Sequence, residues 1–254
     1  MGETPDADGL AAEAPGLLRY ARTIVRDQAL AEDLVQETLT RALEKRASFR
    51  GDSSLATWLH RILHNAAVDH ARRSREDATE DVASLVEKRW QDDTYTVDIS
   101  IVAERAQTIE ELKDALLRLP LIYRTAVVLH DMEELTVAEI ARIHKIGLPA
   151  AKQRLRRGRM MLVSALASRA ERRAARHGVP LTCWDARTQV SDYLDDSLPT
   201  RKRQLLETHL ESCPTCPPLY AALVRARDAV GLLRDSDAVI PSAVAKRIAE
   251  SEPG

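Results

Sequence analysis

Residues 135–162 read LTVAEIARIHKIGLPAAKQRLRRGRMML, and they predict two helices joined by a short turn. Thr136 can cap the first helix together with Glu139, because a Thr followed three residues later by a Glu forms a capping box. Pro149 suits the first position of the next helix, where its missing N–H would have no helical partner. This is the layout of a helix-turn-helix whose recognition helix covers 150–163.

The predicted recognition helix is strongly basic. Its cations are Lys152, Arg154, Arg156, Arg157 and Arg159. Residues 150–178 hold nine Lys and Arg against one acid, whereas residues 74–114 hold twelve acids against five Lys and Arg. Such a separation of charge favours a surface that binds a polyanion. A solvated helix face would also account for the cations, but together with the helix-turn-helix pattern we expect DNA.

Apolar residues recur with a helical period upstream of this motif as well. One helix follows Asp27, a plausible N-cap, and a second covers 55–73 after a turn that offers Ser53 or Ser54 as a cap. We expect Trp58 of this second helix to lie in the protein core, and we expect His60 and His64 to lie on the exposed face of the helix. Residues 76–98 lose the helical period and are interpreted as linker, and one helix resumes near 100 and runs to 119. The sequence therefore predicts an all-α fold.

Length and composition limit the class of protein. The chain has 254 residues, 44% of them hydrophobic and 30% charged, which suits a globular protein of two or three small domains. No apolar run reaches the length of a membrane-spanning helix, and the acidic N-terminus lacks the apolar core of a signal peptide. We therefore expect a cytoplasmic protein without membrane contact, and a disordered tail at 1–14. In that compartment a Cys-x-x-Cys pair favours metal or redox chemistry over a disulfide.

All three cysteines of the chain belong to one candidate metal site. His209, Cys213 and Cys216 follow a His-x3-Cys-x2-Cys spacing, and Cys183 can supply the fourth ligand that a tetrahedral Zn²⁺ needs. The alternative is a surface histidine with buried structural cysteines. A site with four protein ligands has no open position for substrate, and the chain lacks a P-loop and a nucleophile elbow. We therefore expect a non-enzyme with Zn²⁺ as its cofactor.

Three stretches together resemble the extracytoplasmic-function (ECF) group of bacterial sigma factors. They are EDLVQETLTRAL (32–43), FRGDSSLATWLHRILHNAAVDHARR (49–73) and the segment 119–162 that contains the helix-turn-helix. The resemblance implies two helical sigma domains joined by a flexible linker. It also implies a transcription initiation factor that binds core RNA polymerase, through the β′ coiled coil and the β flap, and directs it to the −10 and −35 elements of promoter DNA.

The resemblance also implies roles for individual residues. Polymerase would be bound by Asp33, Leu34, Gln36 and Glu37. The −10 element would be met by Arg50, Ser53, His60, Arg61, His64, Asn65, Arg72 and Arg73. The −35 element would be read by Lys152, Gln153, Arg154 and Arg157. The chain departs from the family pattern at Lys145, where the turn usually has Gly, and at Ala150, where a polar contact is missing.

The C-terminal part resembles the zinc-binding anti-sigma domain, a small helical domain that is often a separate protein. The implied domains are a tail at 1–14, sigma region 2 at 15–75, an acidic linker at 76–105, sigma region 4 at 106–168, a basic linker at 169–180 and the zinc-binding domain at 181–254. Fusion in one chain favours an intramolecular contact between the zinc-binding domain and the sigma domains, with regulation in cis. The alternative function is a helix-turn-helix regulator with a metal or redox sensor that does not act as a polymerase subunit.

Overall fold

The computed structural model describes residues 5–74, 80–168, 171–173 and 181–234, and nearly all of them are helical. The all-α prediction is confirmed. The chain divides into two compact units. The first unit contains Met1–Asp77, Val128–Ala151 and Leu232–Gly254, and the second contains Ala78–Val127 and Lys152–Gly231.

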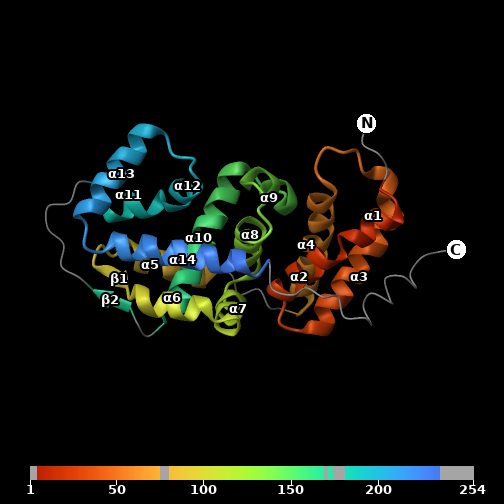
Figure 1. Ribbon diagram of the computed structural model, residues 1–254, viewed down its shortest axis with the longest axis horizontal. Coiled ribbons are helices and arrows are strands. Elements are labelled where there is room, and N and C mark those ends of the chain that lie inside the picture. The colour runs from red at the N-terminus through yellow and green to blue at the C-terminus, as the bar shows by residue number, and fades with distance from the viewer. Residues whose placement is uncertain (1–4, 75–79, 169–170, 174–180, 235–254) are drawn as a thin grey trace. The chain divides into compact units, whose positions relative to one another are not determined.

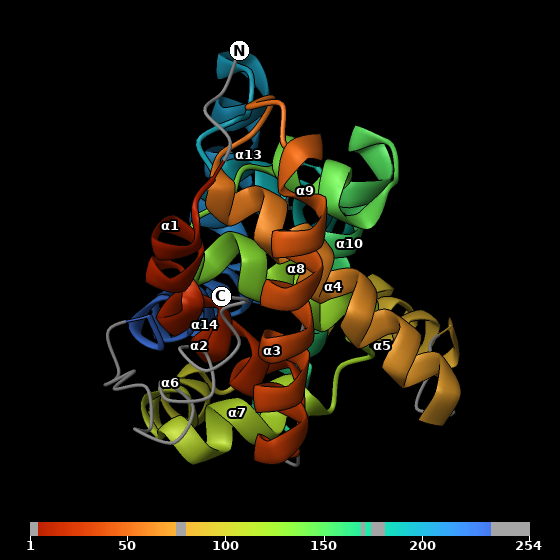
Figure 2. The same cartoon turned by 90° about the vertical axis from the view of Figure 1, so that its right-hand side faces the viewer.

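The first unit is built on a bundle of four helices near the N-terminus (Figure 1). They are α1 (Ala7–Ala12), α2 (Ala14–Ile24), α3 (Gln28–Lys45) and α4 (Leu55–Ser74), with the short 3₁₀ turn η1 (Arg46–Ser48) after α3. The end of α8 (Leu121–Asp131), the helix α9 (Val137–His144) and the first residues of α10 (Leu148–Leu166) complete the unit. Within it α9 packs against α4, and Figure 2 shows the two helices together.

Side-chain caps set the starts of these helices as the sequence predicts. The Asp27 carboxylate accepts from the Ala29 and Leu30 amides at the start of α3. Ser54 Oγ accepts from the Thr57 amide at 3.1 Å at the start of α4. At α9 both halves of the capping box are present. These caps satisfy backbone donors that have no partner inside the helix, which is why the three starts could be located from sequence.

The end of α9 explains one departure from the family pattern. Lys145 adopts the left-handed conformation, with φ 54° and ψ 46°. Glycine is common at such a position because it has no Cβ to clash with the backbone. Lys145 therefore makes the same turn as the usual glycine, at some cost in strain.

The second unit contains the remaining elements. They are α5 (Glu80–Gln91), β1 (Tyr95–Val97), α6 (Ile99–Gln107), α7 (Ile109–Leu117), most of α8 and α10, β2 (Glu171–Arg173), α11 (Cys183–Thr188), α12 (Val190–Leu194), α13 (Thr200–Ser212) and α14 (Cys216–Leu232). The two strands pair antiparallel, with Tyr95 opposite Arg173 and Val97 opposite Glu171. Inside this unit α10 crosses α8 closely at Gly158, where a Cβ would lie 2.6 Å from Val127 Cγ2.

Several sequence predictions about the connecting segments are wrong. The predicted tail forms α1, capped by Asp6. The segment 76–98 is not plain linker, because it contains α5 and β1, and the single helix predicted from 100 to 119 is divided into α6 and α7 at Thr108. Among the side chains of α5 that the structure describes, Ala83 and Trp90 are buried and Leu85 is exposed, so the helix packs through a small face.

The basic linker at 169–180 lies outside the described residues apart from 171–173, and residues 235–254 lie outside them as well. Among the described helices, none combines the length and the apolar composition that crossing a lipid bilayer requires.

Candidate nucleic-acid interface and metal centre

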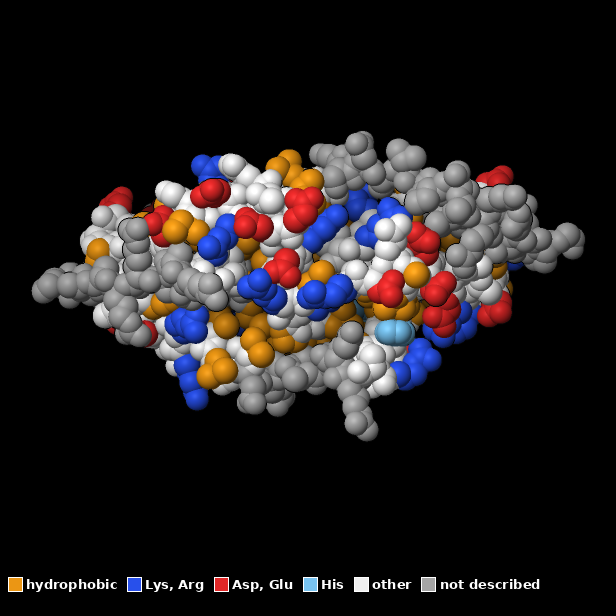
Figure 3. Space-filling view, turned by 90° about the horizontal axis from the view of Figure 1, so that it is seen from below, with side chains coloured by type: hydrophobic (Ala, Val, Ile, Leu, Met, Phe, Trp, Pro, Cys, Tyr) orange, Lys and Arg blue, Asp and Glu red, His pale blue; other side chains and the backbone are white. Residues whose placement is uncertain are grey.

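The predicted −10 contacts on and before α4 divide by exposure. Arg50, Arg61, Arg72 and Arg73 are exposed, and Ser53 and Asn65 are half-buried. Asn65 donates its side-chain amide to the Arg61 carbonyl at 2.7 Å. The exposed arginines leave guanidinium groups available for phosphates. Over the face seen in Figure 3, Lys and Arg side chains are interspersed with Asp and Glu side chains, so the cations there form no continuous basic patch.

His60 and His64 of α4 are buried, and the prediction that they are exposed is wrong. His60 is 4% exposed and His64 is 5% exposed. The His64 ring stacks on the His144 ring of α9, with centroids 4.3 Å apart and planes at 8°. His60 Nδ1 lies 2.8 Å from the Ala56 carbonyl, and its Nε2 lies 3.7 Å from Glu133 Oε2. Burial lowers the pKa of His60 below its usual value, against the opposing effect of the Glu133 carboxylate.

Further polar contacts join the first helix of the helix-turn-helix to α4 and to the turn before it within the first unit. Thr57 Oγ1 donates to Glu139 Oε1 at 3.0 Å, and an Arg142 guanidinium N–H donates to the Asp52 carbonyl at 3.2 Å. Glu139 belongs to the capping box of α9 as well, so one carboxylate both starts α9 and binds α4. The part of α4 around Thr57 and His64 is therefore covered by α9 in this conformation.

The residues assigned to polymerase binding lie on α3, at different depths. Asp33 is exposed, Gln36 and Glu37 are half-buried, and Leu34 is 3% exposed and belongs to the core. Glu37 pairs with Arg41 at 2.6 Å. Trp58 is buried and its ring lies 5.4 Å from that of Phe49, so its predicted place in the core is confirmed.

The cations of α10 meet acidic and aromatic side chains of the second unit. Lys152 Nζ lies 3.0 Å from Asp192 Oδ1, and Arg159 pairs with both carboxylate oxygens of Asp195 at 3.0 and 3.2 Å. Arg156 and Arg157 share Glu87 of α5, at 2.9 and 2.7 Å. Arg156 also lies over the ring of Trp184, 5.3 Å from its centroid. The other two residues assigned to the −35 element are Gln153, which is exposed, and Arg154, which is half-buried.

The four predicted metal ligands come together in one buried cluster. Cys183 starts α11, His209 lies in the last turn of α13, and Cys213 and Cys216 flank the turn into α14. Their ligand atoms all lie within 4.8 Å of one another, and the Sγ atoms of Cys183 and Cys213 are 3.5 Å apart. Two sulfurs that bind one ion tetrahedrally at about 2.3 Å lie roughly 3.8 Å apart. The cluster therefore fits a four-coordinate metal ion.

The surroundings of the cluster affect the thiols unequally. Burial raises the pKa of Cys183 and of Cys216. Burial acts in the same direction on Cys213, but its contact with the Thr215 side chain and hydrogen bonds from the backbone amides of Thr215 and Cys216 lower its pKa to about 6. A thiolate is the form that binds metal, so these donors prepare Cys213 as a ligand.

No sequence motif marks Arg187, which connects the cluster to the segment after α5. Its side chain is fully buried and donates to the carbonyls of Trp90, Asp92 and Tyr95 at 2.5, 2.9 and 2.8 Å. It also donates to Thr215 Oγ1 at 3.2 Å, inside the Cys-x-x-Cys turn. One guanidinium therefore holds three linker carbonyls beside the metal ligands, as its rigid fork of five donors allows.

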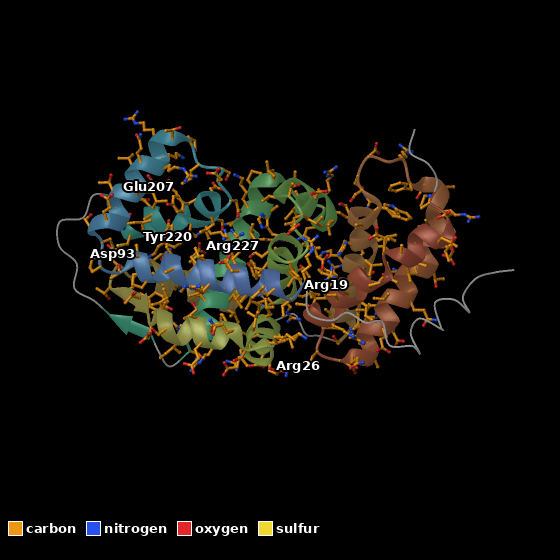
Figure 4. The ribbon with its side chains drawn as sticks, viewed as in Figure 1. Arg19, Arg26, Asp93, Glu207, Tyr220 and Arg227 are labelled. Atoms are coloured by element: carbon orange, nitrogen blue, oxygen red, sulfur yellow. The ribbon has the colours of Figure 1, made fainter. Side chains whose placement is uncertain are left out.

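The Cys-x-x-Cys turn contacts the same segment directly. Thr215 Oγ1 donates to the Asp93 carbonyl at 3.0 Å, and Thr96 Oγ1 donates to the Thr215 carbonyl at 3.1 Å. Figure 4 labels Asp93 near one end of α14, and it labels Tyr220, whose hydroxyl donates to the Ala186 carbonyl of α11. The sequence signal for Arg187 was its position four residues after Cys183, which places both side chains on one face of a helix.

Comparison with known protein families identifies these parts. Residues 10–76 match Sigma-70 region 2, residues 109–162 match Sigma-70 region 4, and residues 183–216 match a putative zinc-finger family. A similar protein is the ECF RNA polymerase sigma factor SigM of Mycobacterium tuberculosis (strain H37Rv), 33% identical over 153 residues that cover 59% of this chain and 71% of SigM.

The chain belongs to the ECF sigma factors.

A second relative agrees with this assignment. ECF sigma factor SigW of Bacillus subtilis (strain 168) is 32% identical over 139 residues, which cover 52% of this ECF sigma factor and 73% of SigW. A chain in a solved complex of the sigma factor RpoE with the anti-sigma factor NepR from Bartonella quintana is also similar, with 25% sequence identity and a TM-score of 0.47. The match covers 63% of the present chain and 94% of the chain in the complex. In this ECF sigma factor α4 lies in region 2, α9 and α10 lie in region 4, and all four candidate ligands lie in the zinc-finger match.

Proposed function

We propose that this ECF sigma factor binds core RNA polymerase and directs it to promoters, with region 2 meeting the −10 element and α10 reading the −35 element. The C-terminal domain regulates this activity in cis. The observation that carries the proposal is the order of parts in one chain, in which region 2, a helix-turn-helix with a basic second helix and a buried Cys₃His cluster follow one another.

Within this proposal polymerase is bound by the exposed side of α3. Asp33 and Glu37 are four residues apart and lie on one helix face, where they can meet cations of the β′ coiled coil. Leu34 contributes from the core by holding α3 against its neighbours. The β flap is the expected contact of region 4.

The test is transcription by core polymerase with the full-length chain, on promoters obtained by selection with the assembled holoenzyme. We expect Asp33→Ala combined with Glu37→Ala to weaken binding to core and to lower transcript yield by about tenfold, as for loss of two interface charges. Glu104→Ala, which removes an exposed acid from α6, is the matched control and should leave binding unchanged.

Two results would contradict the proposal. A wild-type chain that fails to bind core polymerase would exclude a sigma factor function. A chain that binds selected DNA without polymerase and does not support transcription would favour the alternative, a helix-turn-helix regulator with a metal or redox sensor.

Zn²⁺ is the proposed occupant of the Cys₃His cluster. Three sulfurs and one imidazole in a closed shell are the ligands that structural zinc prefers. When bound, the ion would supply cross-linking of α11, α13 and the start of α14. Metal analysis of the purified chain should find one zinc per molecule, and Cys216→Ser should lose it, whereas Ser212→Ala beside the cluster should retain it.

A further inference from the structure

We propose that the carboxylates of α5 and of the segment around α12 occupy the DNA-binding cations of α10, so that the C-terminal domain and promoter DNA compete for the same side chains. The inference rests on the proposed function, because it assigns a regulatory role to the −35 reading helix. It states the direction of regulation, which is inhibition, and the residues that produce it.

The first observation is the stripe of cations that faces the C-terminal domain. Lys152, Arg156 and Arg159 are spaced i, i+4 and i+7, which places them on one face of α10. Each of them meets a residue of the zinc-binding domain or its border, namely Asp192, Trp184 and Asp195 respectively. Along almost two turns of α10, each cation of this face therefore contacts a side chain of the zinc-binding domain.

The second observation is the contribution of the acidic segment between the two sigma regions. Glu87 of α5 binds Arg156 with one carboxylate oxygen and Arg157 with the other. The Glu87 side chain is 15% exposed, and those of Arg156 and Arg157 are 12% and 30% exposed. Partial burial reduces screening by water and salt, so this bridge is stronger than a surface ion pair. Arg157 is one of the residues assigned to the −35 element, and Glu87 covers it.

The third observation is that the backbone that carries Asp192 and Asp195 is held in place by its own domain. Ser197 donates its backbone amide and its hydroxyl to the Asp192 carbonyl at 2.8 and 3.1 Å. Arg227 of α14, labelled in Figure 4, donates to the Leu194 carbonyl at 3.2 Å. The backbone at the C-terminal end of α12 is therefore fixed, so little backbone freedom is lost when its acids meet α10.

Competition follows from the chemistry of the cations. Arginine and lysine bind carboxylate and phosphate oxygens through the same N–H donors, and one donor cannot serve both. Because the carboxylates belong to the same chain, their effective concentration is about millimolar. DNA must displace them before α10 can enter a major groove, which lowers the apparent affinity for promoter DNA.

The test compares full-length chains in binding to a short fluorescein-labelled DNA duplex of random sequence, since the phosphate contribution is independent of sequence. Asp192→Asn combined with Asp195→Asn should bind the duplex about tenfold more tightly than the wild type, because two competing ion pairs are lost. The matched control is Asp196→Asn combined with Glu211→Gln. Asp196 pairs with Arg203 and Glu211 is an exposed acid of α13, and the control removes the same charge from the same part of the chain.

Two further variants make the result specific. Lys152→Ala, added to the Asp192 and Asp195 pair, should reverse part of the gain, because Lys152 is then needed for DNA. Asp192→Asn alone should still tighten binding by about threefold. Asp192 is 37% exposed, so this single change serves if loss of the Asp195 partner of buried Arg159 disturbs folding.

The outcomes separate this inference from the proposed function. Equal effects of the two acid pairs, or no effect of either, would overturn the competition. Binding of every chain to core polymerase is measured in parallel. Failure of the wild type in that assay would overturn the sigma factor function, whereas normal polymerase binding with unchanged duplex affinity would overturn only the inhibition.

Discussion

At the scale of single residues, His60 shows how much a side chain depends on a helix from another part of the chain. Its sequence position on α4 gives no sign that α9 will cover that face, and so exposure was the natural expectation. The four metal ligands are the opposite case. Their spacing encodes a chemical requirement, four donors around one ion, that does not depend on how distant helices pack. Ligand identity was therefore predictable, whereas burial of His60 and His64 was not.

The burial of His60 predicts a pH dependence of stability. Burial holds its pKa below 6.5, so the unfolded chain binds more protons than the folded chain once the pH falls below that value. The free energy of unfolding should therefore decrease as the pH falls below about 6.5 through the folded pKa. The groups that act on the imidazole, Glu133, Glu13 and Arg19, oppose one another, and burial outweighs them.

Urea unfolding at about pH 7.5 and about pH 5.5 measures this effect. His60→Phe keeps an aromatic ring beside Tyr20, which His60 meets edge-on at 5.0 Å, and it removes the proton. The variant should lose less stability on acidification than the wild type. An equal loss in both chains would show that His60 does not contribute to the pH dependence.

At the scale of elements, the crossing of α8 and α10 depends on a position without a side chain. A Cβ at Gly158 would lie 2.6 Å from Val127 Cγ2 and 2.8 Å from the Tyr123 carbonyl oxygen, and a backbone oxygen cannot move aside easily. Gly158→Ala should lower the free energy of unfolding by about 1–2 kcal/mol, because overpacking outweighs the gain in helix propensity. Gly147→Ala, whose Cβ would have only an ordinary contact with Pro149 at 3.7 Å, is the control. Thermal unfolding of both variants provides the measurement, and a Gly158→Ala chain as stable as the wild type would contradict the close crossing.

The helices themselves were predictable where a cap and a strong apolar period coincide. This holds for α3, α4 and α9, whose starts match the expected caps. It fails for α5, which has a small buried face, and for β1, whose partner strand comes more than seventy residues later in the chain. Both elements gain their order from tertiary contacts such as those of Arg187, which no local pattern contains.

At the scale of the whole molecule, the metal centre and the linker should lose their order together. Arg187 and Thr215 join the Cys-x-x-Cys turn to the segment from Trp90 to Thr96. Removing zinc with a chelator should therefore disturb this segment as well as the zinc-binding domain. Trp90 is fully buried, with its indole N–H 2.9 Å from Ser164 Oγ, and it should become solvated.

The measurement is tryptophan fluorescence, with zinc loss verified by metal analysis. We expect a red shift of emission on chelation, and Trp90→Phe should reduce that shift, whereas Trp58→Phe in the first unit should preserve it. Emission that stays unchanged after the zinc has left would mean that the linker keeps its order without the metal.

The short ladder of β1 and β2 has a consequence for the reach of region 4. Because Tyr95 lies opposite Arg173 and Val97 opposite Glu171, the chain from 98 to 170 is a loop tied at its base. While the two strands stay paired, the chain between them is a closed loop whose two ends are held together. Once it opens, each residue released from the strand adds up to about 3.3–3.6 Å of tether. A protein truncated just before the second strand therefore differs from one truncated just after it, because only the longer protein can pair the two strands again.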